Sequence, residues 1–173
     1  MVGAIIIMPV AAAETVAALS KWIVSLIWQA YIADATRLIE IYNAAFYDDY
    51  IRYGECPGYG KTKEKMEHSI SKSPIHMIMK DGIPVGAISF ENRKNGEYYL
   101  GCLCVIPEFQ GVGIGTKAIQ DFLMFYSDWK KITLVTPADK AENISFYTKR
   151  CGFHITGNKM DENVEVVNLC MER

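Results

Sequence analysis

The stretch VIPEFQGVGIG, residues 105–115, decides the fold of this chain. It follows an apolar, β-prone segment, residues 98–106, and it opens a helix in which glycines alternate with small apolar residues. The N-terminus of a helix has four backbone N–H groups without intrahelical partners and carries about half a positive charge. Because glycines have no Cβ, an anion can approach those N–H groups closely. The stretch therefore predicts a loop that binds phosphate, and a pyrophosphate in particular.

Three nucleotide-binding patterns compete for this loop. The dinucleotide fingerprint G-x-G-x-x-G belongs to the first βαβ unit of a chain, whereas here the glycines come late and follow G-x-G-x-G. A P-loop needs G-x-x-x-x-G-K-[ST], and the spacing from Gly111 to Thr116 and Lys117 does not satisfy it. The third pattern, [QR]-x-x-G-x-[GA], is met by Gln110, Gly113 and Gly115.

A second stretch, NISFYTKRCGF at residues 143–153, supports the third pattern. With both stretches in this order, separated by one helix and one strand, the chain resembles the GNAT superfamily of acetyl-CoA-dependent N-acyltransferases. The resemblance covers roughly Leu26 to the C-terminus. A helix that merely begins with glycines would leave the second stretch unexplained, and each glycine inside a helix costs about 1 kcal/mol.

The composition is that of a single globular domain. Of the 173 residues, 50% are apolar, which suffices for one core, and the net charge of −2 offers no electrostatic surface for nucleic acid. No apolar run reaches the roughly 18 residues of a membrane-spanning helix. The cysteines form no C-x-x-C and the histidines have no ligand spacing. We therefore expect reduced thiols and a cytoplasmic protein, with no metal site and no nucleic-acid or membrane partner.

Hydrophobic periodicity and turn residues predict the order of helices and strands. Asp34 is the expected N-cap of the first helix, and Asp139 with Glu142 is the expected capping box of the last helix. Strands are expected at residues 25–30, 75–80, 84–92, 98–106, 132–136, 153–157 and 164–171, and helices at residues 35–50, 63–72, 114–127 and 140–151.

The resulting order, βααβββαβαββ, is similar to that of the GNAT superfamily. The resemblance implies an α/β (α+β) fold with a mixed, mostly antiparallel sheet and helices on both faces. It also implies a splayed central strand pair, in which the strand ending at Ile106 and the strand 132–136 separate around the pantetheine arm of the cofactor. Residues 25–173 form the expected acetyltransferase domain.

Residues 1–24 form an N-terminal extension without a counterpart in the resemblance, and the pattern predicts a helix over residues 12–24. Three interpretations stay open for it. The extension covers an apolar patch, provides an oligomer contact such as that of a homodimer, or precedes the natural start of the protein.

The resemblance further implies which residues bind acetyl-CoA. Backbone N–H groups of the glycine-rich loop would bind the pyrophosphate, and main-chain groups of the strand before it would pair with the pantetheine amides like an added strand. Asn143 lies one turn before Tyr147, whereas many family members carry asparagine at the position of Lys140. Lys149 is either a phosphate contact or a surface lysine. The implied cofactor-binding residues are Leu103, Cys104, Val105, Gln110, Gly111, Val112, Gly113, Ile114, Gly115, Thr116, Asn143 and Tyr147.

Tyr147 is the expected general acid, because the resemblance places a tyrosine at this point to protonate the leaving thiolate. A phenol of pKa near 10 donates to a sulfur near 8.5 with little driving force, so its position matters more than its acidity. The Val105 N–H is expected to stabilise the thioester oxygen as it becomes negative. The alternative for Tyr147 is an aromatic residue that only packs in the core.

Glu97 is the candidate general base. Simple alternation on strand 98–106 puts Glu97, Tyr99 and Val105 on one face, and Cys102 and Cys104 on the other with Tyr98 and Leu100. Many family members carry a carboxylate or histidine at the position of Tyr99, and Glu97 lies two residues before it. Asp48, Asp49 and Glu55 are further acidic candidates on the helix and loop that wall the substrate groove.

These observations together predict an enzyme, an N-acetyltransferase that moves an acetyl group from acetyl-CoA to a primary amine by direct transfer. The amine belongs to a small molecule or a peptide. Transfer through Cys102 or Cys104 is a lesser alternative. A non-catalytic module of the same fold that binds or senses acetyl-CoA is the first competing hypothesis, and a nucleotide-binding domain of another kind is the second.

Overall fold

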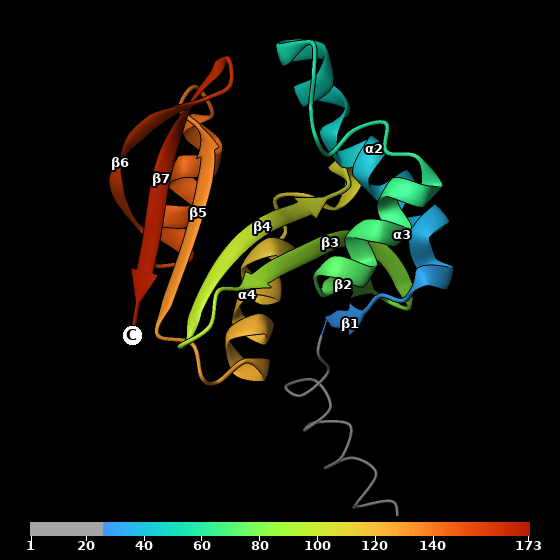
Figure 1. Ribbon diagram of the computed structural model, residues 1–173, viewed down its shortest axis with the longest axis horizontal. Helices are drawn as coiled ribbons and strands as arrows, with labels where there is room; N and C mark the ends of the chain where they lie inside the picture. The colour runs from blue at the N-terminus through green and yellow to red at the C-terminus, as the bar shows by residue number, and fades with distance from the viewer. Residues whose placement is uncertain (1–25) are drawn as a thin grey trace, which may run out of the picture.

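A single seven-stranded sheet organises the protein, and the computed structural model describes residues 26–173. The predicted helix over residues 12–24 lies outside the described residues. All neighbouring strands run antiparallel except β4 and β5, so the predicted mixed, mostly antiparallel sheet is confirmed (Figure 1). The strands follow in the spatial order β1 (Ile27–Gln29), β2 (Ile75–Lys80), β3 (Ile83–Asn92), β4 (Glu97–Val105), β5 (Lys131–Pro137), β7 (Val164–Glu172) and β6 (His154–Asp161).

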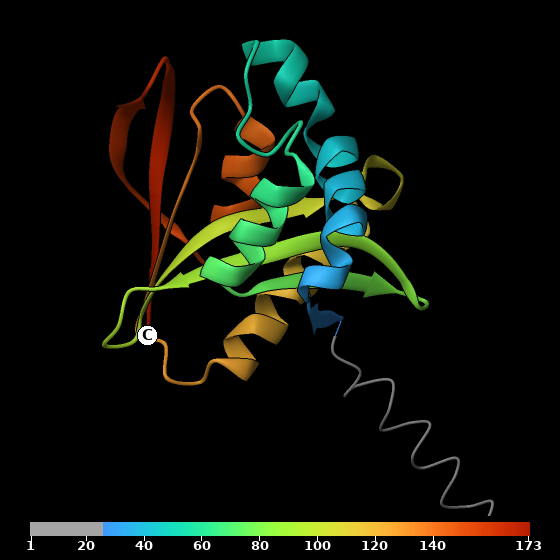
Figure 2. The same cartoon turned by 45° about the vertical axis from the view of Figure 1, so that its right-hand side comes forward.

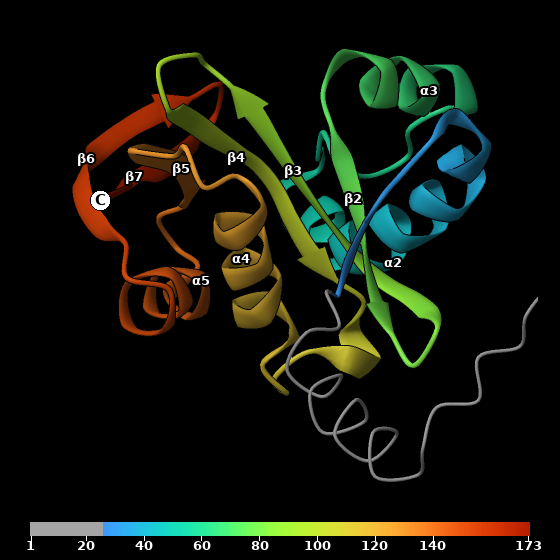
Figure 3. The same cartoon turned by 90° about the horizontal axis from the view of Figure 1, so that it is seen from below.

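Helices cover both faces of this sheet, as predicted (Figure 3). On one face lie α2 (Ala35–Tyr53) and α3 (Lys63–Lys72), which cross in front of β2 to β4 in Figure 2. On the other face lie α4 (Ile114–Phe125) and α5 (Ala141–Ser145), and α5 continues into a π-helical turn, Phe146–Arg150. Short 3-10 turns, Ile32–Asp34 and Pro107–Phe109, precede α2 and α4.

Each face has its own apolar core. Leu38, Ile41 and Met66 pack against the sheet on the α2 side, and Phe122, Ile132 and Leu169 are fully buried on the α4 side. Burying an apolar side chain of this size stabilises the fold by about 1.5–3 kcal/mol. The two cores hold α2 and α4 on opposite faces of the last residues of β4.

The central strand pair separates as predicted. β4 and β5 pair at only three positions, Glu97 with Lys131, Tyr98 with Ile132 and Tyr99 with Thr133. Beyond these pairs the two strands diverge towards the top of Figure 1. Within residues 26–173, the edge of β4 that faces β5 is therefore without a strand partner from Leu100 to Val105.

A β-bulge at Gly101 changes the faces of β4. Ser89 of β3 pairs with Cys102, but the next residue, Phe90, pairs with Leu100, so Gly101 is an extra residue. An extra residue reverses the alternation of side chains beyond it. Leu100 and Val105 therefore share the α4 core, whereas Cys104 joins the α2 core. The predicted simple alternation, with Leu100 and Cys104 on one face, is wrong.

Asp34 is the N-cap residue of α2, as predicted, whereas the capping box predicted at Asp139 is wrong. The Asp34 carboxylate accepts a hydrogen bond from the Tyr31 N–H at 2.8 Å and makes no capping bond to α2. Lys140, not Asp139, is the N-cap residue of α5, and no described side chain caps that helix. The Asp139 carboxylate instead accepts a hydrogen bond from the hydroxyl of Tyr53, the last residue of α2.

Candidate active site

A pocket of about 450 Å³ lies where the free end of β4 meets α2, α4 and α5. The structure brings most of the predicted cofactor-binding residues together along its wall. These are Leu103, Cys104, Val105, Gln110, Gly111, Gly113, Ile114, Gly115, Thr116, Asn143 and Tyr147. Val112 does not line the pocket, and its side chain is 69% exposed.

The glycine-rich loop, residues 110–116, has a backbone that requires glycine at two positions. Gly111 and Gly113 have φ angles of 76° and 86°, in the left-handed region that other residues rarely adopt. A Cβ at either position would meet no described atom within 4 Å, so there is open space beside each glycine. A Cβ on Gly115 would lie 3.2 Å from Phe146 Cζ, so this glycine lets the turn after α5 pack closely.

The first turn of α4 presents backbone donors to the pocket. The first intrahelical hydrogen bond runs from Lys117 N to Gly113 O at 3.1 Å, and no side chain of the described residues caps the helix. The N–H groups of Ile114, Gly115 and Thr116 therefore have no intrahelical acceptor. Arg150 also lines the pocket, and within residues 26–173 it makes no ion pair. The unpaired N–H groups at the start of α4 and the Arg150 guanidinium can therefore bind a diphosphate.

Arg150, which the sequence analysis passed over, lies on the same helix face as two predicted residues. Asn143, Tyr147 and Arg150 are spaced i, i+4 and i+7, which is the spacing of one helical face. Lys149, the predicted candidate for a phosphate contact, is exposed and outside the pocket lining. The helical period could therefore have identified Arg150 from the sequence.

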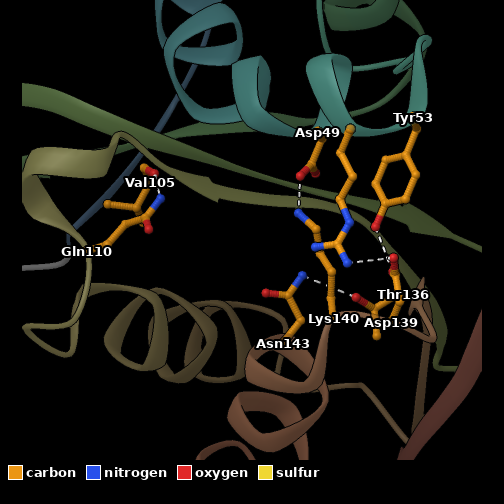
Figure 4. A network of polar contacts seen from close by, with 9 residues as sticks. Asp49, Tyr53, Val105, Gln110, Thr136, Asp139, Lys140 and Asn143 are labelled. Atoms are coloured by element: carbon orange, nitrogen blue, oxygen red, sulfur yellow. Dashed lines mark hydrogen bonds and ion pairs between the residues drawn. The ribbon is translucent and has the colours of Figure 1, made fainter.

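The free edge of β4 presents peptide groups to the pocket. Ile106 N donates to Val85 O at 2.9 Å, so the peptide groups of Cys104 also point towards β3. Those of Leu103 and Val105 alternate with them and point into the gap towards β5. Gln110 Nε2 donates to Val105 O at 2.7 Å, as Figure 4 shows. Gln110 thus fixes the glycine-rich loop to the end of β4.

Tyr147 lies in the π-helical turn and is 9% exposed. Its ring packs edge-on against Phe146 and Phe153, with ring centroids 5.0 and 5.7 Å away. Burial raises the pKa of Tyr147 well above its ordinary value, and the neighbouring thiol of Cys102 raises it further. The hydroxyl therefore keeps its proton at neutral pH and is a donor to the pocket.

Asn143 connects α5 to the sheet. Its Nδ2 donates to Thr136 Oγ1 at 3.2 Å, and Thr136 is buried at the end of β5 (Figure 4). Asn143 lines the same pocket as Tyr147. Asn143 therefore fixes the start of α5 against the diverging end of β5.

Glu97 is not part of this pocket. It begins β4 whereas Val105 ends it, so about 26 Å of strand separates the two residues. The bulge at Gly101 also puts Glu97 and Val105 on opposite faces. The structure therefore does not bring Glu97 together with the pocket residues, and its role as the general base stays a prediction. The carboxylates that do line the pocket are Asp48 and Asp49 of α2.

Polar side chains join α2 to the segment before α5, and we call these five residues the α2–α5 seam: Asp49, Arg52, Tyr53, Asp139 and Lys140. The ammonium of Lys140 bonds to the Asp49 carboxylate, and this pair is about one-fifth exposed. The Asp139 carboxylate forms an ion pair with Arg52 at 2.9 Å and accepts a hydrogen bond from the Tyr53 hydroxyl at 2.6 Å (Figure 4). The hydrogen bond from Tyr53 holds the pKa of Asp139 below its ordinary value, and burial with this bond raises the pKa of Tyr53 to about 12.

Of the two cysteines of β4, Cys104 is buried and Cys102 is half-buried. Cys104 lines the pocket but its side chain belongs to the α2 core. Its hydrogen bond with Cys102 and its burial raise the pKa of the Cys104 thiol. A thiol that stays protonated is a weak nucleophile. In the part of the chain that the structure describes, no three metal-binding side chains come together, and no helix is long and apolar enough to cross a membrane.

Comparison with known proteins identifies the family of this architecture. The profile of the family described as "Acetyltransferase (GNAT) family" matches residues 35–153. The uncharacterized protein YrkN of Bacillus subtilis (strain 168) is 35% identical over 82 residues, which are 47% of this chain and 44% of YrkN. The chain thus matches less than half the length of this curated relative.

Solved structures share the fold at low sequence identity. An acetyltransferase from Thermus thermophilus is 14% identical with a TM-score of 0.70, over 85% of this chain and 96% of its own. The PaiA N-acetyltransferase from Thermoplasma acidophilum, solved in complex with coenzyme A, is 19% identical with a TM-score of 0.67, over 82% and 96% of the two chains.

Proposed function

The chain belongs to the acetyltransferase (GNAT) family, and on this premise we propose that it transfers an acetyl group from acetyl-CoA to a primary amine by direct transfer. One observation carries the proposal. The open N–H groups at the start of α4 and the free edge of β4 lie on the same pocket, at the spacing of the family motif. The coenzyme A found with the PaiA N-acetyltransferase, which has a similar fold, supports this choice of cosubstrate.

Different residues of the pocket would bind different parts of acetyl-CoA. The N–H groups of Ile114, Gly115 and Thr116 would bind the diphosphate, with Arg150 as the countercharge. The peptide groups of Leu103 would pair with the pantetheine amides in the manner of an added strand, because Val105 O already accepts a hydrogen bond from Gln110. Acetyl-CoA supplies the acetyl group as an activated thioester.

Two groups of the chain would act on the reacting atoms. The Val105 N–H points into the gap, where it would stabilise negative charge on the thioester oxygen by about 3 kcal/mol. The Tyr147 hydroxyl would donate its proton to the departing sulfur. Burial raises its pKa and so makes it a weaker acid, which means that its place in the pocket, and not its acidity, supports this role. Transfer through Cys104 is less favoured, because its raised pKa keeps the thiol protonated.

The reaction needs a direct test of binding and of turnover. Isothermal titration should show one acetyl-CoA bound per chain, and a thiol-release assay should show turnover with primary amines drawn from small molecules and peptides. Absence of binding would overturn the proposal. Mass spectrometry of rapidly quenched enzyme should find no acetylated cysteine, and such an adduct would favour transfer through Cys104.

A second candidate function follows from the position of Glu97. Among the described residues, no carboxylate or histidine of β4 lines the pocket. By the family resemblance, the position that often carries the base holds Tyr99 here. This favours a module of the same fold that binds acetyl-CoA without catalysis. Tight binding without turnover across the amine panel would select this alternative.

We also propose that the protein works in the cytoplasm as a small-molecule or peptide-amine acetyltransferase. All five cysteines are free thiols, which fits a reducing compartment. An oxidised form with paired cysteines in protein isolated from its natural source would contradict this location. The contribution of residues 1–24 to a homodimer is tested by comparing the mass in solution of the full chain with that of a chain beginning at residue 25.

A further inference from the structure

The Asp49 carboxylate already holds an ammonium group in the pocket. Lys140 supplies that ammonium from the opposite wall, and both residues line the pocket (Figure 4). The pair is only about one-fifth exposed, so it is partly withdrawn from water. A primary ammonium is also the group that the proposed acceptor carries. In the pocket, the Asp49 carboxylate is therefore paired with an ammonium of the protein's own chain, the same chemical group that the proposed acceptor carries.

Charge divides the pocket into two ends. The end at the glycine-rich loop has no carboxylate among its described lining residues and includes Arg150. The end at α2 contains the two carboxylates that line the pocket, Asp48 and Asp49. An anionic diphosphate therefore fits the loop end, whereas a cationic ligand fits the α2 end.

An ammonium that Asp49 holds as an ion pair is not a nucleophile while it stays protonated. An adjacent carboxylate favours the charged, protonated form of an amine, and a protonated amine has no lone pair with which to attack a thioester. The amine that is acetylated must therefore be a different group from the cation that Asp49 binds. An acceptor that uses Asp49 has at least two amino groups.

We propose that Asp49 binds a second, non-reacting cationic group of the acceptor, and that Lys140 occupies Asp49 when the acceptor is absent. The acceptor class is then a diamine or polyamine, or a basic peptide, rather than a monoamine. This inference rests on the proposed acetyl transfer and adds the acceptor class to it. Acceptor binding exchanges one ammonium for another, so the carboxylate is never left unpaired.

A purely structural role for the pair is the competing explanation, and the seam contains a matched control for it. Asp139 makes an ion pair with Arg52 across the same two segments; this pair is about half exposed, and Asp139 does not line the pocket. Asp139→Asn therefore weakens the seam without removing a pocket carboxylate. Asp49→Asn weakens the seam and removes the proposed cation site.

The experiment compares cadaverine with pentylamine, which share a five-carbon chain but differ in the second ammonium. In the unmodified protein, kcat/KM should be about tenfold or more higher for cadaverine. Asp49→Asn should reduce this ratio to near unity, whereas Asp139→Asn and the charge-conserving Asp49→Glu should retain it. Lys140→Met removes the competing ammonium, so it should lower KM for cadaverine by several-fold. A series of diamines of three to six carbons then measures the spacing between Asp49 and the reaction site.

Calorimetry gives a readout that does not depend on turnover. Cadaverine should bind the Lys140→Met variant, and Asp49→Asn added to it should abolish that binding. Acetyl-CoA affinity should stay within about twofold in each variant; its loss in Lys140→Met would make Lys140 a cofactor residue and overturn the inference. Equal ratios in Asp49→Asn and Asp139→Asn would overturn it as well. Acetylation of monoamines irrespective of Asp49 would leave acetyl transfer standing and sink only this inference, whereas failure of acetyl-CoA to bind would remove both.

Discussion

At the loop end of the pocket the ligand-facing groups belong to the backbone, whereas at the α2 end they belong to side chains. The loop end depends on residues that are consecutive in the sequence, from Gln110 to Thr116. The α2 end depends on Asp49 and Lys140, which are 91 positions apart. A backbone site is fixed by local conformation, and a side-chain site by how distant segments pack. The first should tolerate changes in surrounding side chains, and the second should respond to single charges.

The largest expected effect is at the loop end, where Gly113→Asp puts a carboxylate against the diphosphate. Gly113 has open space for a side chain, so the substitution changes charge and backbone preference without a clash. Like charges in contact cost several kcal/mol, so we expect the dissociation constant of acetyl-CoA to rise about a hundredfold in calorimetry.

Gly54→Asp is the matched control for this change. Gly54 has a φ angle of 77°, also with no described atom near a Cβ, and it ends α2 outside the pocket lining. It carries the same backbone strain without the charge effect. Equal loss of binding in both variants would show that backbone strain, and not repulsion of phosphate, is responsible.

The next effect lies where the two ends of the pocket meet. Tyr147→Phe removes the proton donor but keeps the ring packing, so kcat should fall by about a hundredfold with acetyl-CoA affinity unchanged. Because burial raises the pKa of Tyr147, its ionisation should cause no loss of rate as the pH rises from 8 to about 10. Steady-state kinetics across this pH range test both statements.

Tyr42→Phe is the control for the loss of a buried tyrosine hydroxyl. Tyr42 is buried in the α2 core and burial raises its pKa too, but it does not line the pocket. Its turnover should match that of the unmodified protein. Unchanged turnover in Tyr147→Phe would remove Tyr147 as the acid.

A smaller effect on acetyl-CoA affinity is expected at Arg150, and its neighbour Lys149 provides the comparison. Arg150→Met should weaken acetyl-CoA binding by about threefold to fivefold, because an exposed charge contributes up to about 1 kcal/mol. Lys149→Met, one residue away and outside the lining, should change it little, and salt should narrow the difference. An equal loss of acetyl-CoA affinity in both variants would mean that the net charge of the protein, and not the position of Arg150 on the pocket-facing side of the helix, controls binding.

The smallest effect concerns stability and lies outside both ends of the pocket. His76 is 8% exposed, its Nδ1 has no hydrogen-bond partner within residues 26–173, and burial lowers its pKa. Above the ordinary histidine pKa of about 6.5 both states are neutral, and the stability is fully present. As the pH falls below that value the unfolded chain gains the proton first, so stability decreases until the lower folded pKa is passed.

His76→Phe should therefore flatten the decrease in melting temperature between pH 7.5 and 5.5. His68→Phe, on the exposed side of α3, should leave the decrease unchanged. An identical slope in the His76 variant would show that other groups control the acid sensitivity of the fold. A smaller decrease in melting temperature in His76→Phe would show that His76 causes the acid sensitivity of the fold. Any loss of activity that this variant still shows between pH 7.5 and 5.5 could then be assigned to the pocket.

Much of the fold could be predicted because its determinants are local. The periodicity of the strands, the Asp81-Gly82 turn and the order of the two motifs each depend on residues within one element. The glycine-rich loop could be predicted for the same reason, since Gly111 and Gly113 need left-handed angles. Asn143 and Tyr147 reach the pocket because helical spacing puts them on one face.

The remainder depends on relations that a single element does not contain. The bulge at Gly101 is defined by pairing with β3, and it reversed the expected faces of β4 and with them the place of Glu97. A glycine inside a strand is a signal for such a bulge, and it could have prompted this expectation. The pairing of Asp139 with Arg52 has no local signal, because it depends on where α2 ends in space.

The divergence of β4 and β5 has a consequence for solubility. An open strand edge normally invites edge-to-edge aggregation with other proteins. Here the open edge beyond Tyr99 lies along the pocket between β4 and β5, so another strand could pair with it only by entering the space proposed for acetyl-CoA. The two outer edges are protected differently, since β1 has only three residues and β6 is interrupted by an irregularity between Ile155 and Gly157. The protein thus keeps its unpaired central edge in the pocket proposed for its cosubstrate, and its two outer edges are a short strand and an irregular one.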